Sequence, residues 1–288
     1  MKAIYLDYNA TSPVRPQVSK RIRPFVDESF GNPSSLHAQG RKARASVEAV
    51  RTSLLKVLGN PKGQLIFTSG GTEADNIALR GIAEAMRSKG DHLVVSSVEH
   101  HAVLHVAQAL EEEGFRVTVV PVDSEGVVNL QALQQAITPK TCLISVMGAN
   151  NEVGTIQPVE EIARIAHEHG VLFHTYAVQS FGKLPLDVLR MGADLVSISG
   201  HKLGGLKGSG ALYLREGIRV KPLLRGGPHE RNLRAGTEGV VGIVAIGAAA
   251  ALCLAERDSG SLDRIRQLRD RLEKGLRERL PDVELNGH

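Results

Sequence analysis

A lysine in a glycine-flanked loop is the residue of this sequence best suited to covalent chemistry. Lys202 stands in the segment SGHK (199–202), directly after an apolar run that predicts a strand. A lysine amine packed near apolar or positive groups loses part of its basicity and becomes a nucleophile toward an aldehyde. Taken by itself, a lysine in such a loop is more often a solvated surface residue, so the ends of the other predicted strands must be considered with it.

A pair of glycines followed by a hydroxyl is the second candidate. Gly71 and Thr72 follow a predicted strand, 65–68, and open a predicted helix, 72–88. Backbone N–H groups and the dipole at such a helix start can hold a phosphate. The sequence contains neither a Walker loop nor a G-x-G-x-x-G fingerprint. A capped helix without any ligand is the alternative interpretation.

Polar side chains also follow other predicted strands. His100 follows the strand at 93–96, and an imidazole there can stack on a flat ring or move a proton. Asn151 lies in a turn-forming segment after the strand at 142–146, and Gln179 follows the strand at 171–174. A surface histidine and a plain turn explain these residues equally well when each is taken alone.

Taken together, these strand ends match one cofactor. A phosphate cradle, a ring-stacking imidazole, two amides and a reactive lysine fit pyridoxal phosphate (PLP), which carries a phosphate, a flat ring, a phenolic oxygen and an aldehyde. No metal is expected. His101 and His105 have the i, i+4 spacing of a helical metal pair, but no H-E-x-x-H motif and no cysteine ligand supports one.

The elements that position these residues alternate along the chain. Apolar runs typical of strands occur at 65–68, 93–96, 116–122, 142–146, 171–174, 195–198 and 211–214, and helical patterns occur at 41–58, 72–88, 102–113, 129–137 and 158–169. This alternation predicts an α/β fold with a mainly parallel sheet covered by helices on both faces. Ligands of such sheets bind at the carboxyl ends of the strands, where the candidate residues stand.

Composition excludes several classes of protein. The chain has 288 residues, 42% hydrophobic and 23% charged, which is typical of a globular protein rather than a disordered one. The net charge of +4 is spread along the chain, so no nucleic-acid partner is expected. No apolar run approaches the roughly 18 residues of a membrane span, and 240–254 is predicted to be a buried helix.

Cysteine usage favours a reducing compartment. Cys142 and Cys253 are the only cysteines of the sequence, and each stands in an apolar run, the first in a predicted strand and the second in a predicted helix. A disulfide framework is therefore excluded and a cytoplasmic location is expected. Beyond residue 235 the pattern changes to two helices and a short strand at 283–285, which predicts a second, smaller unit.

Seven motifs carry a resemblance to a known family. They are YLDYNAT at 5–11, GNPSS at 31–35, TSGGTE at 68–73, EH at 99–100, NNEVG at 150–154, SGHK at 199–202 and RAGTE at 234–238. In order and spacing the sequence resembles the NifS/IscS-like cysteine desulfurases of the class V aminotransferase family. The resemblance implies a PLP-dependent transferase of fold type I, with a large PLP-binding domain at 13–235 and a small α+β domain formed by 1–12 and 236–288.

The resemblance also implies site residues. Lys202 would bind PLP covalently, and His100 would stack on the ring and help to move protons. The other expected contacts are Gly71, Thr72, Ser199 and His201 to the phosphate, Gln179 to the phenolic oxygen, Asn151 beside the ring and substrate, and Thr237 to the phosphate of the neighbouring subunit in a homodimer. The family reaction takes sulfur from L-cysteine, leaving alanine and an enzyme persulfide, and delivers the sulfur to iron–sulfur scaffolds or other acceptor proteins.

The sequence departs from the family pattern in two major ways, and in a smaller third way at Gly204 and Leu206, which replace bulkier or stiffer residues after the lysine. Tyr176 stands where the family has an aspartate that keeps the pyridine nitrogen protonated, and a neutral phenol cannot supply that charge. The family segment with the persulfide-forming cysteine and a substrate-binding arginine has no counterpart in these 288 residues. We therefore expect impaired chemistry. The alternatives are a pseudo-enzyme that acts as a binding partner, and another class V PLP activity such as a selenocysteine lyase or an aminotransferase.

Overall fold

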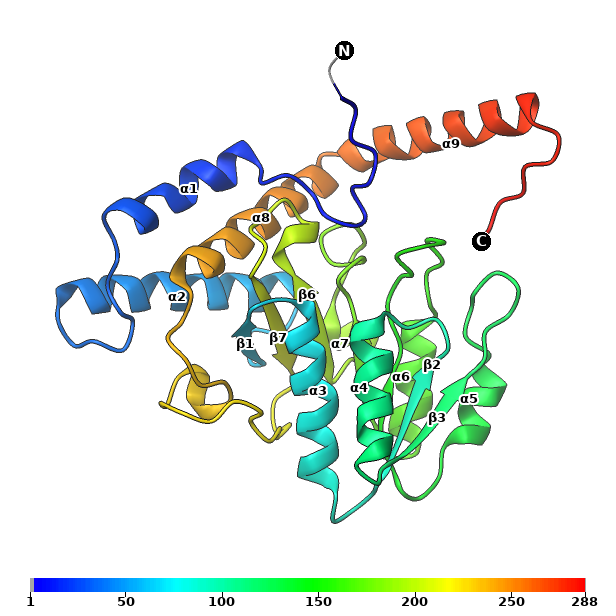
Figure 1. Ribbon diagram of the computed structural model, residues 1–288, viewed down its shortest axis with the longest axis horizontal. Coiled ribbons are helices and arrows are strands. Elements are labelled where there is room, and N and C mark those ends of the chain that lie inside the picture. The colour runs from blue at the N-terminus through cyan, green and yellow to red at the C-terminus, as the bar shows by residue number, and fades with distance from the viewer. Residues whose placement is uncertain (1–2, 288) are drawn as a thin grey trace.

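The computed structural model describes residues 3–287. Within that range the chain forms one seven-stranded sheet in the order β1-β7-β6-β5-β4-β2-β3 (Figure 1). The strands are β1 Gln64–Thr68, β2 His92–Ser96, β3 Arg116–Val120, β4 Thr141–Ser145, β5 Leu172–Tyr176, β6 Leu195–Ser199 and β7 Gly210–Leu214. Strands β3, β2, β4, β5 and β6 are parallel, and β7 runs antiparallel to both β6 and β1. The predicted α/β fold with a mainly parallel sheet is confirmed.

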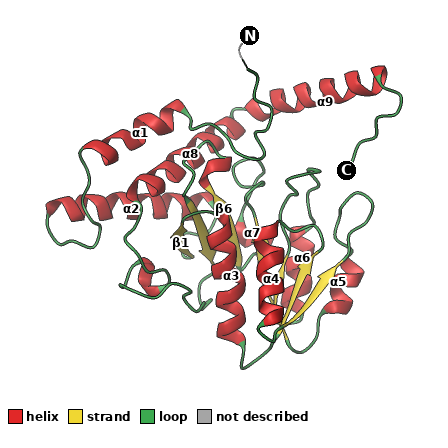
Figure 2. Ribbon diagram, in the orientation of Figure 1, coloured by secondary structure: helices red, strands yellow, loops and turns green. Residues whose placement is uncertain are grey.

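Helices cover both faces of the sheet (Figure 2). They are α1 Pro16–Asp27, α2 Ala38–Val57, α3 Gly71–Met86, α4 His101–Glu112, α5 Leu130–Ala136, α6 Val159–Glu168, α7 Val188–Met191, α8 Val240–Asp258 and α9 Ser261–Arg279, with short 3-10 helices at Gly200–Lys202 and Glu230–Asn232. Neighbouring strand residues serve opposite faces: Leu143 belongs to the same buried cluster as Ile77 of α3, and Ile144 to the cluster of Ile162 in α6. Strands β2, β4, β6 and β7 are buried along their whole length and do not alternate between buried and exposed residues, whereas the edge strand β3 is partly exposed.

The predicted helix at 240–254 is confirmed as part of α8, and its place in the fold explains its composition. By length and composition alone α8 would suffice to cross a membrane. In the folded chain, Ile243, Ile246 and Ala249 are buried in the hydrophobic core, and α8 lies against α1 and α2 (Figure 1). The domain boundary predicted at residue 235 stays a prediction, although α8 shares one buried cluster with the sheet.

Two regions differ from the sequence-based expectation. The strand predicted at 283–285 is wrong, because these residues form no β-bridge within the described chain and Val283 and Leu285 are exposed. A strand needs a neighbour that accepts and donates its hydrogen bonds. Helix α1 was not predicted, although its signals are present: Pro16 stands at its first position, and Val18 and Ile22 form a buried i, i+4 pair.

Candidate active site

The start of α3 lies close to the end of β5. A Cβ atom on Gly71 would stand 3.0 Å from Val178 Cγ2, 3.6 Å from Tyr176 Cε2 and 3.8 Å from Ser199 Cβ. Glycine at position 71 therefore lets the helix start approach the strand ends. The first N–H groups of a helix have no partner within it, so this end of α3 can hold an anion, with Thr72 exposed beside it. The predicted residues Gly71, Thr72 and Ser199 are thus brought together.

One face of the His100 ring is stacked on Tyr176. The two ring centroids are 5.3 Å apart and the planes differ by 8°. Tyr176 is only 4% exposed, and His100 is half-buried. His100 Nδ1 accepts a hydrogen bond from the Ala102 N–H at 3.0 Å, which caps α4 and leaves the proton of the neutral imidazole on Nε2.

Lys202 lies in a loop that contacts the N-terminal segment. After β6, the short helix Gly200–Lys202 turns the chain so that Lys202 Nζ donates to the carbonyls of Asn9 and Ala10, the latter at 2.8 Å. Gln179 Nε2 donates to the same Asn9 carbonyl at 3.0 Å. The segment at 5–11, which the sequence analysis gave no chemical role, therefore brings Lys202 and Gln179 to one point.

Burial and neighbouring charge lower the basicity of this region. Burial lowers the pKa of Lys202 and is the largest effect on it. The Asp7 and Glu152 carboxylates raise that pKa and offset part of the shift. Burial also lowers the pKa of His100 and of His201, and the positive charge of Lys202 contributes to both shifts. His201 is held by Thr11, with Nδ1 and Oγ1 3.1 Å apart. The site thus favours neutral amine and imidazole groups.

The loop that contains Asn151 is folded around the preceding asparagine. Asn150 Nδ2 donates to the Val98 carbonyl at 3.0 Å, and Asn150 Oδ1 accepts from the N–H groups of Glu152 and Val153. Asn151 is half-buried, and its Nδ2 donates to Glu152 Oε1 at 2.6 Å. The loop therefore lies beside the segment that leads to His100, with the amide of Asn151 engaged by its neighbour.

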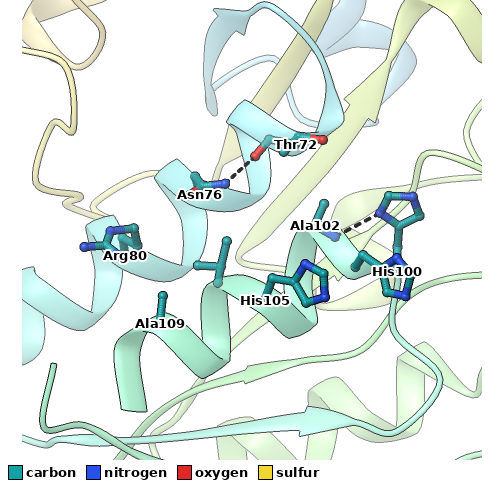
Figure 3. Close-up of a pocket in the computed structure, with 9 residues that line it drawn as sticks. Thr72, Asn76, Arg80, His100, Ala102, His105 and Ala109 are labelled. Carbon is teal, nitrogen blue, oxygen red and sulfur yellow. Dashed lines mark hydrogen bonds between the residues drawn. The ribbon is translucent and has the colours of Figure 1, made fainter. Parts of the chain in front are cut away.

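A cavity of about 440 Å³ opens beside His100 between α3 and α4 (Figure 3). Thr72 and Asn76 line it from α3, and His101 and His105 line it from α4, their rings stacked with centroids 4.9 Å apart. Within residues 3–287, no group of three or more His, Cys, Asp and Glu side chains could hold a metal ion. Of the predicted site residues, the cavity contains Thr72 and His100 but not Lys202.

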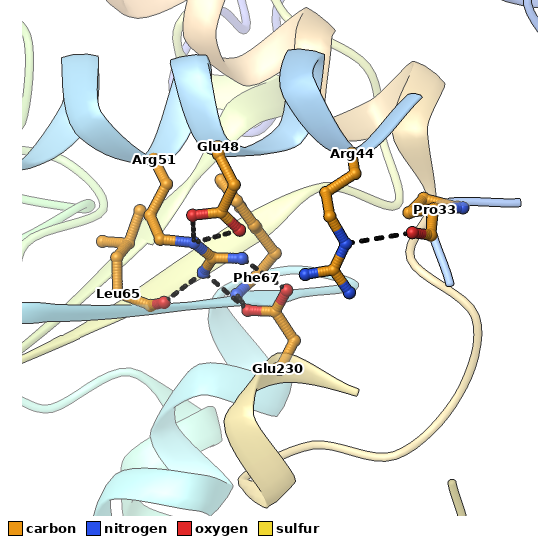
Figure 4. A network of polar contacts seen from close by, with 7 residues as sticks. All are labelled: Pro33, Arg44, Glu48, Arg51, Leu65, Phe67 and Glu230. Atoms are coloured by element: carbon orange, nitrogen blue, oxygen red, sulfur yellow. Dashed lines mark hydrogen bonds and ion pairs between the residues drawn. The ribbon is translucent and has the colours of Figure 1, made fainter. Parts of the chain in front are cut away.

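Thr237 lies on a separate, exposed segment. It lines a cavity of about 160 Å³ together with Gly208 and with Ser69, two residues before Gly71, and His100 is not among the lining residues. The segment is fixed by Glu230, whose carboxylate accepts from Arg51 Nη2 at 2.8 Å, from Nη1 at 2.9 Å and from the Phe67 N–H at 2.8 Å (Figure 4). Three successive residues at this buried pair, 230–232, have positive φ values of 43°, 58° and 67°.

Two buried acids lie next to the site and were not among the predicted site residues. Asp75 lies on the apolar face of α3, and neither of its buried carboxyl oxygens has a hydrogen-bond partner within residues 3–287. Glu99 Oε1 accepts from the Ser96 hydroxyl at 2.5 Å and from the Met147 N–H at 2.7 Å. Burial raises the pKa of Tyr176, and the charges of Asp75 and Glu99 add to this. An acid within the apolar stripe of a predicted helix was the signal that could have identified Asp75.

Comparison with known proteins shows the family to which this chain belongs. The aminotransferase class-V family matches residues 4–288. The cysteine desulfurase IscS of Dictyoglomus turgidum is 47% identical over 286 residues, which cover 99% of this chain and 72% of that protein. The IscS of Methanosarcina thermophila is 49% identical over 287 residues, covering 100% of this chain and 70% of that one.

Solved structures of related proteins are also similar to this chain. A NifS-like protein superposes with a TM-score of 0.92 at 40% identity, covering 96% of this chain and 76% of that one. SspA in complex with cysteine superposes with a TM-score of 0.82 at 41% identity, covering 86% of this chain and 72% of that one. The family match over residues 4–288 and these relatives show that the chain belongs to the NifS/IscS-like cysteine desulfurases of the class V aminotransferase family.

Proposed function

We propose that this protein is a PLP-dependent cysteine desulfurase that binds its cofactor through Lys202 and removes sulfur from L-cysteine, leaving alanine. The observation that carries the proposal is the Lys202 amine, half-buried and of lowered pKa, in the loop after β6. At neutral pH a larger fraction of such an amine is unprotonated and able to attack an aldehyde. Relatives bearing the name cysteine desulfurase and the cysteine complex of SspA support the choice of substrate.

The residues of this chain fit the phosphate and the aldehyde of PLP but not its ring. The glycine start of α3, which a Cβ at position 71 would crowd, suits the phosphate. The Lys202 amine suits the aldehyde. The ring position is different, because the face of His100 that would receive the ring already carries the side chain of Tyr176.

The protein groups have separable tasks in this proposal. PLP, when bound, supplies the electron sink for the substrate's reacting carbon. The carbonyls of Asn9 and Ala10 accept from Lys202 Nζ and orient its nitrogen. His100 keeps Nδ1 engaged with the Ala102 N–H, so Nε2 is the nitrogen that gives and receives a proton. Gln179 holds the Asn9 carbonyl from the other side.

The two cysteines are unsuited to carry the sulfur. Cys142 lies in β4 and Cys253 in α8, as predicted, and both are buried. Burial raises the pKa of Cys142 to about 11 and raises that of Cys253 as well. Because the thiolate is the nucleophile, neither thiol is fit to take sulfur from the substrate. The acceptor thiol must come from outside these two positions.

The proposal extends to the assembly. We infer a cytoplasmic homodimer in which Thr237 reaches the phosphate site of the second subunit and an iron–sulfur scaffold or another acceptor protein takes the sulfur. The exposure of Thr237, on a segment that the Arg51–Glu230 pair anchors at Glu230, supports a role for this residue outside its own subunit.

Covalent trapping tests the cofactor site. Purified protein is incubated with PLP, reduced with borohydride and digested, and the modified peptide is identified by mass spectrometry. We expect the adduct on Lys202, its loss in K202A and its retention in K207A, since Lys207 is an exposed lysine of the same loop. Alanine release from L-cysteine is then measured on the same preparations. An adduct distributed over surface lysines, with none on Lys202, would overturn the proposal.

One observation favours the alternative of a binding protein without turnover. Tyr176 places a buried neutral ring against His100, where the family has an aspartate. If the Lys202 adduct forms but no alanine is released, the chain holds the cofactor as a pseudo-enzyme.

A further inference from the structure

The stacked pair of His100 and Tyr176 leaves no room for a third ring. Their centroids are 5.3 Å apart and the planes are nearly parallel, so the planes are separated by at most that distance. Carbon atoms of stacked rings approach to about 3.5–4.0 Å, so a ring inserted between two others needs outer planes about 7 Å apart. The imidazole is fixed by the hydrogen bond that its Nδ1 accepts from the Ala102 N–H. While that bond is kept, a flat ligand can reach this face of His100 only if Tyr176 moves.

Tyr176 also lies next to the proposed phosphate cradle. Its Cε2 atom is 3.6 Å from the Cβ position of Gly71, and Val178 Cγ2 and Ser199 Cβ are within 3.8 Å of the same point. The phenol thus stands between the start of α3 and the imidazole. A cofactor with its phosphate at Gly71 and its ring on His100 would need the volume that the phenol fills.

The side chain is well packed in this position. Tyr176 is 4% exposed and belongs to the buried cluster that includes Ile77, Val95 and Met147. Tyr176 is the last residue of β5, and the backbone of β5 is fixed by its pairing with β4 and β6. Tyr176 can therefore uncover the face of His100 only by rotation of its side chain. The closed arrangement is therefore a defined packed state and not a disordered side chain.

We propose that Tyr176 is a built-in plug that occupies the aromatic slot on His100 and competes with the ring of PLP for it. The inference rests on the proposed function, in which the cofactor ring binds at His100. If the slot is open in about 0.1–10% of molecules, the apparent affinity for PLP is lowered by about 10- to 1,000-fold, since ligand binds only the open state.

Equilibrium titration with PLP, followed by absorbance, tests the plug on four proteins. We expect Y176A and Y176V, which shorten the side chain, to bind PLP at least about 10-fold more tightly than the wild type. Y176F is the matched control. It keeps the ring and removes only the hydroxyl, so it should bind as weakly as the wild type. Circular dichroism establishes that each variant is folded, and Y176V fills part of the slot should Y176A not fold.

Three outcomes of this titration would contradict the proposal about Tyr176. If the wild type, Y176A and Y176V bind PLP with equal affinity, the proposal that Tyr176 blocks the ring position is wrong, while the proposed PLP site still stands. Tight binding by Y176F as well as Y176A overturns it too, because the hydroxyl and not the ring would then be the obstacle. If no variant binds PLP and none gives the Lys202 adduct, the proposed function fails, and the plug with it.

Discussion

Burial, more than ion pairing, sets the protonation of the groups beneath the site. His174 Nε2 lies 3.6 Å from Asp75 Oδ1, a distance within the range of an ion pair. Burial, however, lowers the pKa of His174 to about 3 and raises that of Asp75 well above its usual range. Burial therefore favours the neutral form of both groups. His174 makes its hydrogen bonds to the hydroxyls of Ser145 and Ser197 instead.

Glu99 gives a prediction for stability against pH. Burial raises its pKa to about 7, above the roughly 4.3 of an unfolded chain. The folded state thus binds this proton more tightly, and the stability that Glu99 contributes is fully present below about pH 4 and is lost as pH rises to 7. Relative to the wild type, E99Q should gain about 2–3 kcal/mol in free energy of unfolding between pH 5 and pH 8.

Denaturant unfolding at several pH values measures this difference. The titration of His174 is common to both proteins and cancels. E125Q, at an exposed position, serves as the control and should differ from the wild type by a constant amount. A wild-type minus E99Q difference that stays flat from pH 5 to pH 8 would show that Glu99 is ionised throughout.

At the scale of elements, hydrophobic periodicity predicts the helices and strands whose signals lie within their own residues. The strand predicted at 195–198 is β6, Leu195–Ser199, and the helix predicted at 72–88 is α3, Gly71–Met86. Each has its signal within its own residues, as an apolar run or as an amphipathic stripe opened by glycine. The antiparallel direction of β7 could not be predicted in this way, because it depends on which strands become its neighbours.

The same distinction holds for the candidate site. Gly71 and Lys202 could be singled out because their loops carry their own sequence signals. The stacking of His100 on Tyr176 could not, since it joins the ends of β2 and β5 through side-chain rotation. The role of Asn9 was also hidden, because only folding brings its carbonyl to Lys202, 193 positions further along the chain.

The segment after β7 depends on one buried ion pair, and this can be tested. Glu230 is the partner of Arg51, and their side chains are 2% and 5% exposed. Removing one member of a buried pair costs about 3–5 kcal/mol, and removing Glu230 also takes away the acceptor of the buried Phe67 N–H. We expect E230A to lower the free energy of unfolding by that amount, as measured by urea denaturation.

Glu48 supplies the matched control on the same arginine. It also pairs with Arg51, at 3.2 Å, but its side chain is 45% exposed. Exposed pairs contribute about 0–1 kcal/mol, so E48A should be nearly neutral. Similar losses for E48A and E230A would contradict the importance given to the buried contact, and with it the anchoring of the segment that carries Thr237.

At the scale of the whole molecule, the candidate site is assembled from distant parts of the chain. The site lies at the carboxyl ends of β5 and β6. Hydrogen bonds join the N-terminal segment at 9–12 there to the residues that follow β5 and to the loop after β6. Helix α8 lies against α1 and α2, and α1 follows that N-terminal segment directly. Arg15 strengthens the link through its ion pair with Glu256 at 2.5 Å. The packing of α8 thus helps to fix the segment that accepts hydrogen bonds from Lys202.

Helix α9 stands apart from this body and gives the last prediction. It extends away from the sheet (Figure 1), and none of its side chains is buried. Its apolar side chains recur at helical spacing at Ile265, Leu268, Leu272 and Leu276, and Leu272 is 64% exposed. With little packing to lose on opening, its amides should exchange with deuterium at least about 100-fold faster than those of α3, measured by hydrogen exchange with mass spectrometry. Protection equal to that of α3 would mean that the leucine stripe is covered in solution. Protection that grows with protein concentration would then identify the cover as a second copy of the chain.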